Sequence, residues 1–309
     1  MRGFGVRLLC ALLLAPLTIS VAAADPPTTV PVAIVNGLAG EAIEVYVAKN
    51  EGFFAKHHID ATLTSIGSPQ IVMTGLFSGQ SQIAMSNPVQ LLTAVNGGLD
   101  FVVIAGGTRV TAAKDPVGLD LRPDVPYTSA ADLKGLSIGV PGFNSAAFMA
   151  FKGWLQQRHV DPSTIHFVEV QMSAENDLLQ GHKLDGVLAI EPYTTEIVKN
   201  GAGKLVSHFM HDLAPDRPSL FWISTRAWAQ ANPQVVAAFR ESMADAIKFI
   251  NANQDKTRDM ETAVFGSADP NLGFFTLGVV PKDLEQFYVM GKQQGVFTKD
   301  IDTNTLILK

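Results

Sequence analysis

The feature of this sequence that most restricts its fold is a repeated alternation of short apolar segments with amphipathic ones. Residues 32–35, 59–66, 82–86 and 101–105 have the length and composition of strands, and helix-forming segments separate them. Strand and helix in alternation are typical of a largely parallel sheet with helices on both faces. The first third of the chain therefore predicts one α/β unit.

A second alternation follows a stretch rich in proline and aspartate at residues 115–127. Within that stretch, residues 117–121 predict a strand that crosses between two domains. The elements expected after it are a short capped helix from Ser129, strands at 136–140, 165–170 and 186–190, and helices at 145–158 and from Ser173 to 180. The sequence thus predicts two α/β units.

The last third of the chain predicts a long helix at residues 233–253 with an apolar stripe that includes Val236, Phe239 and Met243. This tail is too small for a domain of its own. We therefore predict a discontinuous first lobe made of residues 25–115 and 210–309. Residues 116–209 form the second lobe in this interpretation, and the two connections act as a hinge.

The first 24 residues predict a secretory signal peptide. Arg2 and Arg7 precede an apolar run at residues 8–21, and three alanines at 22–24 supply the small residues of a cleavage site. The apolar run is shorter than the roughly 20 residues that a membrane span needs. We therefore expect a periplasmic protein, exported and then cleaved.

Charge and motifs exclude several classes of protein. The net charge is −6 with no basic block, which argues against nucleic acid as a partner because that affinity depends on Lys and Arg. The only cysteine is Cys10, so thiolate chemistry is absent from the mature chain. Phosphate-loop, dinucleotide-binding and nucleophile-elbow motifs are also missing. We predict no catalytic residue, no metal site and no cofactor.

The candidate binding residues follow from the rule that ligands of open α/β sheets lie at the carboxyl ends of strands, near helix N-termini. Small polar residues recur at these positions, although each could be only a cap or a turn former. Arg109 could pair with an anionic ligand or serve the structure, and aromatic residues at strand ends are more often core than ligand wall. The predicted ligand-binding residues are Gly37, Leu38, Ala39, Gly40, Glu41, Gly67, Ser68, Ser86, Asn87, Arg109, Phe143, Asn144, Ser145, Glu191, Tyr193 and Trp222.

Several segments resemble a known family. "VYVAKNEGFF" at 45–54, "IDATLTSIGSPQIVMTGLFSGQSQIAMSNP" at 59–88, "ADLKGLSIGV" at 131–140 and "KLDGVLAIEPY" at 183–193 are similar to the solute-binding proteins of nitrate, sulfonate, taurine and thiamine-precursor ABC importers. The resemblance implies a type II periplasmic-binding-protein fold, in which two α/β lobes close over a small ligand. Phe143 and Glu191 depart from the family pattern and favour a larger organic ligand over a small inorganic anion.

The function that this resemblance implies is an extracytoplasmic solute-binding protein of an ABC importer. We expect a monomer that delivers a small organic solute, either a sulfonate or an aromatic or pyrimidine-like compound, to a membrane permease and its ATPase. Two alternatives stay open. One is the thiamine-pyrimidine synthase branch of the same fold, whose cysteine-rich iron motif this chain lacks. The other is a ligand-sensing module for a signalling partner.

Overall fold

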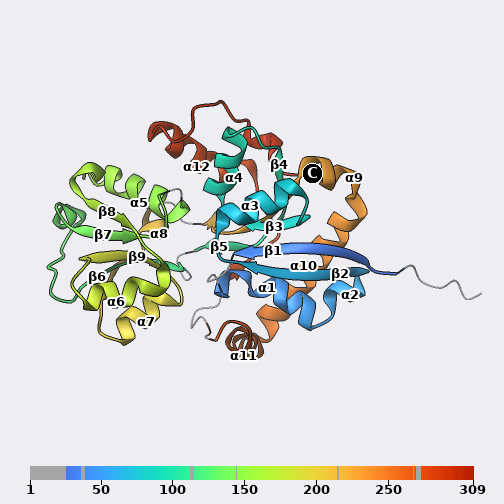
Figure 1. Ribbon diagram of the computed structural model, residues 1–309, viewed down its shortest axis with the longest axis horizontal. Coiled ribbons are helices and arrows are strands. Elements are labelled where there is room, and N and C mark those ends of the chain that lie inside the picture. Colours follow the sequence, from blue (N-terminus) through green and yellow to red (C-terminus); the bar gives the residue numbers. More distant parts are fainter. Residues whose placement is uncertain are drawn as a thin grey trace, which may run out of the picture.

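Two α/β lobes lie side by side in the computed structural model, each built on its own five-stranded sheet (Figure 1). The structure describes residues 26–35, 39–111, 115–143, 145–213, 216–266, 268 and 273–309, and the side chains of Ala39, Gly40 and Pro69 are not among the described ones. The predicted signal peptide at 1–24 lies outside the described residues. So do the predicted site residues Gly37, Leu38 and Asn144.

The sheet of the first lobe has the strand order β2 (Ile59–Ile66), β1 (Thr28–Val35), β3 (Ile83–Ser86), β12 (Phe221–Thr225) and β4 (Phe101–Gly106). Strand β1 runs parallel to β2 and β3, as the alternation predicts. Strand β12 comes from the last third of the chain and lies antiparallel between β3 and β4. The sheet is therefore mixed, and the C-terminal third completes it.

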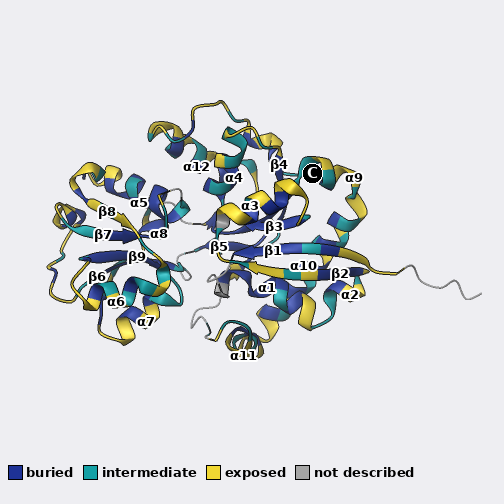
Figure 2. Cartoon of the chain, in the orientation of Figure 1, coloured by how far each residue is buried: buried dark blue, intermediate teal, exposed yellow. Residues whose placement is uncertain are grey.

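Helices cover both faces of this sheet, and its strands β1, β3, β4 and β12 are largely buried, whereas the edge strand β2 is partly exposed (Figure 2). The predicted stripe on the long helix is buried, with Val236, Phe239 and Met243 all in the core of the first lobe. The helices of this lobe are α1 (Ala39–Asn50), α2 (Phe53–Lys56), α3 (Pro69–Ser78), α4 (Pro88–Asn96), α9 (Arg226–Ala231), α10 (Pro233–Ala252), α11 (Gln254–Phe265) and α12 (Pro281–Gln293), with a 3₁₀ turn at Thr303–Thr305.

The second lobe has the strand order β10 (Lys204–Ser207), β6 (Val117–Leu121), β9 (Gly186–Ile190), β7 (Ser137–Val140) and β8 (His166–Glu169). Strand β7 is parallel to β8 and β9, whereas β6 is antiparallel to β9 and β10. The helices of this lobe are α5 (Ala146–Gln157), α6 (Glu175–Gln180), α7 (Tyr193–Lys199) and α8 (Phe209–Leu213), with 3₁₀ turns at Ala130–Leu133, Pro162–Thr164 and Met172–Ala174.

Two details of the second lobe differ from the sequence prediction. Ser173 does not cap α6, because it lies inside the 3₁₀ turn that precedes the helix. Phe209 and Met210 pack into the core of the second lobe, so this lobe continues through α8 instead of ending at residue 209. The chain returns to the first lobe only after Leu213.

A small sheet lies where the chain enters and leaves the second lobe. It consists of β5 (Thr108–Val110) between β11 (Arg217–Pro218) and β13 (Phe274–Phe275). Strand β5 precedes the outgoing crossing and β11 follows the returning one. The antiparallel pairing of β5 with β11 holds the two crossings side by side.

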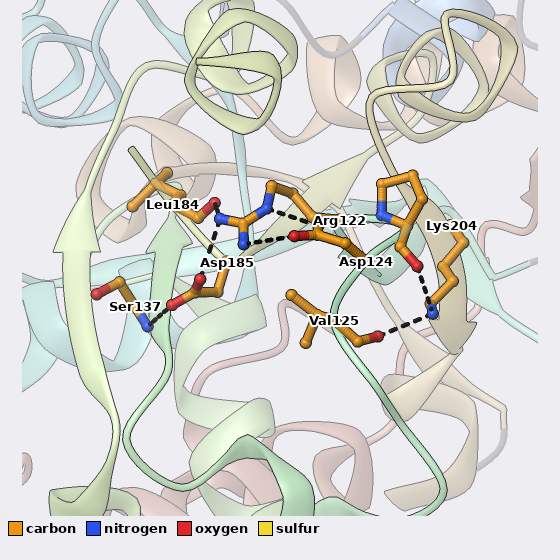
Figure 3. A network of polar contacts seen from close by, with 8 residues as sticks. Arg122, Asp124, Val125, Ser137, Leu184, Asp185 and Lys204 are labelled. Carbon is orange, nitrogen blue, oxygen red and sulfur yellow. Dashed lines mark hydrogen bonds and ion pairs between the residues drawn. The ribbon is translucent and has the colours of Figure 1, made fainter. Parts of the chain in front are cut away.

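A polar network connects strand ends and neighbouring loops of the second lobe (Figure 3). Arg122 Nη1 donates to Leu184 O at 3.0 Å and to Asp185 Oδ1 at 3.1 Å, and Asp185 Oδ2 accepts from the Ser137 backbone at 2.8 Å. Lys204 Nζ donates to Val125 O at 2.8 Å. These contacts join the ends of β6, β7 and β9 and connect β10 to the segment after β6.

Within the ranges that the structure describes, no helix combines the length and apolar character needed to cross a membrane.

Candidate ligand-binding cleft

A cavity of about 630 Å³ lies between the two lobes and is lined by residues of both. Cavities of about 300 to 1,000 Å³ are typical of small-molecule sites. Strands of both sheets end at this cavity, because its lining includes the last residues of β1, β3 and β9, which are Val35, Ser86 and Ile190. The predicted convergence of strand ends on one gap is therefore present in the structure.

Three helices begin at the cavity, and their caps line it. Asn87 accepts a hydrogen bond from Gln90 N at 3.0 Å at the start of α4, and Ser145 accepts one from Phe148 N at 3.1 Å at the start of α5. Ser68 precedes α3 and donates to Gln70 Oε1 at 2.8 Å. First turns of helices carry backbone N–H groups without helical partners. The cavity can therefore offer hydrogen-bond donors to acceptor atoms of a ligand.

The structure brings together many of the residues predicted for ligand binding. Ala39 and Gly40 open α1, the helix whose first turn also carries Glu41. The predicted residues that line the cavity are Glu41, Gly67, Ser68, Ser86, Asn87, Phe143 and Ser145.

Arg109 has a different place from the one predicted. Its guanidinium donates to both carboxylate oxygens of Asp283 at 2.9 Å and to Asp216 Oδ1 at 2.8 Å. It does not belong to the described lining of the cavity. These contacts join β5 to α12 and to the segment before β11, so we assign Arg109 to the structure of the hinge region and not to ligand binding.

Trp222, Glu191 and Tyr193 are also absent from the described lining. Trp222 is only 1% exposed and packs edge-on against Phe239 in the core of the first lobe. Glu191 accepts hydrogen bonds from the backbone and hydroxyl of Thr195 in the first turn of α7, and Tyr193 packs against a small apolar cluster under β9. Each of these three residues has a structural role in this arrangement.

The lining residues that the sequence reasoning missed include Glu169 and several glutamine and methionine side chains. Gln70 and Gln90 lie in the first turns of α3 and α4, two residues after Ser68 and three residues after Asn87. Met73, Met172 and Met210 supply flexible apolar surface. The position of each glutamine in the first turn of its helix could have predicted this role, because a long side chain there can reach past the N-terminal end of the helix.

Glutamates are the only charged residues in the described lining: Glu41 comes from the first lobe and Glu169 from the second. Glu41 accepts a hydrogen bond from the Ser219 hydroxyl, and Glu169 Oε2 accepts one from Phe143 N at 3.2 Å. No lysine, arginine or histidine is found among the described lining residues. Each lobe therefore contributes one acidic residue to the described lining.

Glu44 lies one turn behind Glu41 on α1 and is 1% exposed. Burial raises the pKa of Glu44 from 4.5 to about 8, and the nearby charge of Glu41 contributes to this rise. The hydrogen bond that Glu44 accepts from Trp222 Nε1 at 3.1 Å lowers the pKa, but by less. Glu44 is therefore mainly neutral at pH 7. Glu41 lies in the first turn of the same helix, where the helix dipole favours an acidic side chain.

Two α/β lobes with two crossings and a cavity between them define the class of protein, which is that of the periplasmic binding protein fold. The periplasmic aliphatic sulphonate binding protein SsuA of Escherichia coli superposes with a TM-score of 0.77 over 91% of this chain and 97% of its own, at 14% identity. The periplasmic nitrate-binding protein NrtA of Synechocystis superposes with a TM-score of 0.70 over 90% and 84%, also at 14% identity. The predicted fold class is confirmed.

The sequence identifies the family within this class. Residues 40–257 match the model of the family described as NMT1/THI5 like, so the chain belongs to that family. A formylaminopyrimidine-binding protein of Halalkalibacterium halodurans is 23% identical over 215 residues, which is 69% of this chain and 63% of that protein. The chain thus matches a little under two thirds of the length of that curated relative. The resemblance drawn from the sequence segments is confirmed.

Proposed function

We propose that this chain is the extracytoplasmic solute-binding protein of an ABC importer. It captures a small organic solute between its lobes and presents it to a membrane permease that works with an ATPase. The observation that supports this most is the cavity itself, which residues of both lobes line at strand ends and helix starts. Such a cavity couples ligand binding to lobe closure, because the ligand must contact both lobes at once.

The lining favours an organic solute over an inorganic ion. Asn87, Gln90 and Ser145 provide polar groups, whereas Met73 and Leu220 provide apolar surface. A small inorganic ion would leave the apolar part of a 630 Å³ cavity without contacts. We therefore propose a sulfonate, an aromatic compound or a pyrimidine-like compound as the solute, within the range that the names of the relatives suggest.

We assign no catalytic activity to the chain. The relatives and similar structures are named as binding proteins. The thiamine-pyrimidine synthase alternative requires a cysteine-rich iron motif, and the sequence has a single cysteine, at position 10. We propose further that the signal peptide at 1–24 directs the protein to the periplasm, where it acts as a monomer.

The experiment that tests this function is native mass spectrometry of residues 25–309 purified from the periplasm, followed by thermal unfolding with a panel of small metabolites. We expect one co-purified molecule, or a class of compounds that raises the melting temperature. A ligand at 100 times its Kd stabilises a protein by about 2.7 kcal/mol. The variant Asn87→Ala should weaken binding, whereas Ser163→Ala, in an exposed turn of the second lobe, should not.

Absence of any bound molecule, together with no stabilisation by any compound of the panel, would contradict the proposal. Conversion of a panel compound to a product by the purified protein would contradict it as well, in favour of an enzyme.

A further inference from the structure

Two carboxyl groups are buried together in the second lobe, where α6 and α7 pack on the sheet. Asp120 of β6 and Glu175 of α6 are each 0% exposed. All four of their carboxyl oxygens lack a hydrogen-bond partner among the described residues. The ion pairs that the described part of this lobe forms include neither residue. An ionised carboxylate is very costly in such a place, so the group binds a proton instead.

The two groups, called the buried carboxyl pair below, lie close enough to influence each other. Burial raises the pKa of Glu175 well above its usual value, and the charge of Asp120 raises it further. Burial also raises the pKa of Asp120, to about 7. Thr194 Oγ1 of α7 and Asp120 Oδ2 each lie 3.3 Å from the position that a Cβ on Gly118 would take, so α7 packs directly on β6 here.

The charged groups around the pair do not neutralise it. The charge of Glu191 acts to raise the pKa of Asp120. Arg122, after β6, pairs with Asp124 and Asp185, and Lys204 of β10 donates to two backbone carbonyls. The other titratable groups on the elements around the pair are the exposed Asp177, His182, Lys183, Glu196 and Lys199, the half-buried Tyr193, and, toward the opposite face of the sheet, Asp115, His208, His211 and Asp212.

The elements that meet at the pair also carry lining residues of the cleft. Val117 lines the cavity and lies on β6, three residues before Asp120. Met172 lines it as well and lies three residues before Glu175, in the 3₁₀ turn that leads into α6. Ile190 ends β9, the strand beside β6. A change in the packing of α6 on the sheet therefore changes the second-lobe wall of the cleft.

We propose that the buried carboxyl pair is a pH-sensitive contact that holds α6, and with it the cleft wall at Gln171 and Met172, on the sheet of the second lobe. Opening of α6 exposes both carboxyl groups to water, where they ionise. Opening therefore releases protons and becomes easier as the pH rises. The inference rests on the proposed function, because the wall belongs to the proposed solute cleft, and it adds regulation by pH to that site.

Hydrogen–deuterium exchange of the protein without added solute measures this opening, because amides exchange through local opening of the structure. The readout is the protection factor of residues 171–180 at pH 5 and pH 7, corrected for the intrinsic exchange rate at each pH. It should fall by at least about tenfold per pH unit, which is about 1.4 kcal/mol, since opening releases at least one proton. Residues 146–157 of α5 pack on the other face of the sheet and should keep their protection.

Variants then assign the effect to the pair. Asp120→Asn and Glu175→Gln each remove one titrating group and should each reduce the fall in protection between pH 5 and pH 7. The double variant should abolish it. Asp177→Asn, an exposed acid on the same helix, is the matched control and should follow the wild type. Because the two single variants change different elements, either one tests the inference if the other does not fold.

Three results would overturn the inference. The first is a protection factor of residues 171–180 that does not change between pH 5 and pH 7. The second is an equal pH dependence in wild type and double variant. The third is an equal fall in α5, because the whole lobe would then be unfolding. None of these results bears on solute binding, which fails separately if no molecule co-purifies and no compound stabilises the protein.

Discussion

Replacement of Glu44 by glutamine should remove a loss of stability that the wild-type protein suffers as the pH rises. Glu44 is buried on α1, its Oε1 accepts a hydrogen bond from Trp222, and its Oε2 has no partner among the described residues. Glutamine has nearly the same shape and keeps an acceptor for Trp222, but it does not ionise. The substitution therefore isolates the cost of a buried negative charge.

The size of the effect follows from the pKa of Glu44, which burial raises from 4.5 to about 8. A carboxyl group with a raised pKa in the folded state stabilises that state below its unfolded pKa, and this contribution is lost as the pH rises through the folded pKa. The shift corresponds to a total loss of about 5 kcal/mol, of which about 3 kcal/mol falls between pH 6 and pH 9. This is a large part of the 5 to 15 kcal/mol that stabilises a typical domain.

The assay is urea unfolding of wild type and Glu44→Gln at pH 6 and pH 9, with the free energy of unfolding taken from the linear extrapolation. The wild type should lose about 3 kcal/mol more than the variant over this interval. Glu285→Gln, an exposed glutamate of α12, is the control and should follow the wild type. Equal pH dependence in wild type and Glu44→Gln would refute the reasoning, because Glu44 would then be ionised at little cost.

Three further predictions concern other contacts. Asp120 is buried on β6 near Glu175, and burial raises its pKa to about 7. Asp120→Asn should therefore lose less free energy of unfolding than wild type between pH 4 and pH 8 in the same assay. The same change of this free energy with pH in both proteins would contradict the prediction. Asn87→Ala removes the cap of α4 and should lower the free energy of unfolding by about 1 kcal/mol, measured in urea at pH 7. Arg109→Met leaves Asp283 buried without its cation and should cost about 3 kcal/mol or more, yet leave the Kd of the solute unchanged by calorimetry. A large change in that Kd would return Arg109 to the binding site.

The sequence predicts the local parts of this fold well because their causes are local. The strand at 59–66 and the strand at 186–190 have the bounds that their apolar patterns predict. Asn87 caps its helix as expected, since a cap bonds to a backbone N–H only three residues further on. Ser145, predicted as the first residue of its helix, is the cap of that helix. The same locality explains why the caps that line the cavity were found: a helix start at a strand end is visible in the sequence.

The side chains that were misplaced depend on contacts far away along the chain. Arg109 stands at a strand end, but its partners Asp216 and Asp283 are 107 and 174 residues distant in sequence. Trp222 lies on β12, and its burial depends on the insertion of that strand between β3 and β4. A strand-end position therefore identifies the region of a site, whereas the direction of each side chain is decided by tertiary pairing.

The insertion of β12 also bears on how the lobes can move. Because this strand completes the first sheet after the chain has passed through the second lobe, two crossings are required, and β5 pairs with β11 beside them. We expect the lobes to bend at these crossings. A further contact joins the lobes outside the crossings: Gln294 Nε2, just after α12, donates to Met149 O of α5 at 3.2 Å. Gly153 on α5 allows this approach, since a Cβ there would lie 3.0 Å from the sulfur of Met290. A bend at the crossings that separated α5 from α12 would break this contact, and its energy would then add to that of the ligand in holding the lobes together.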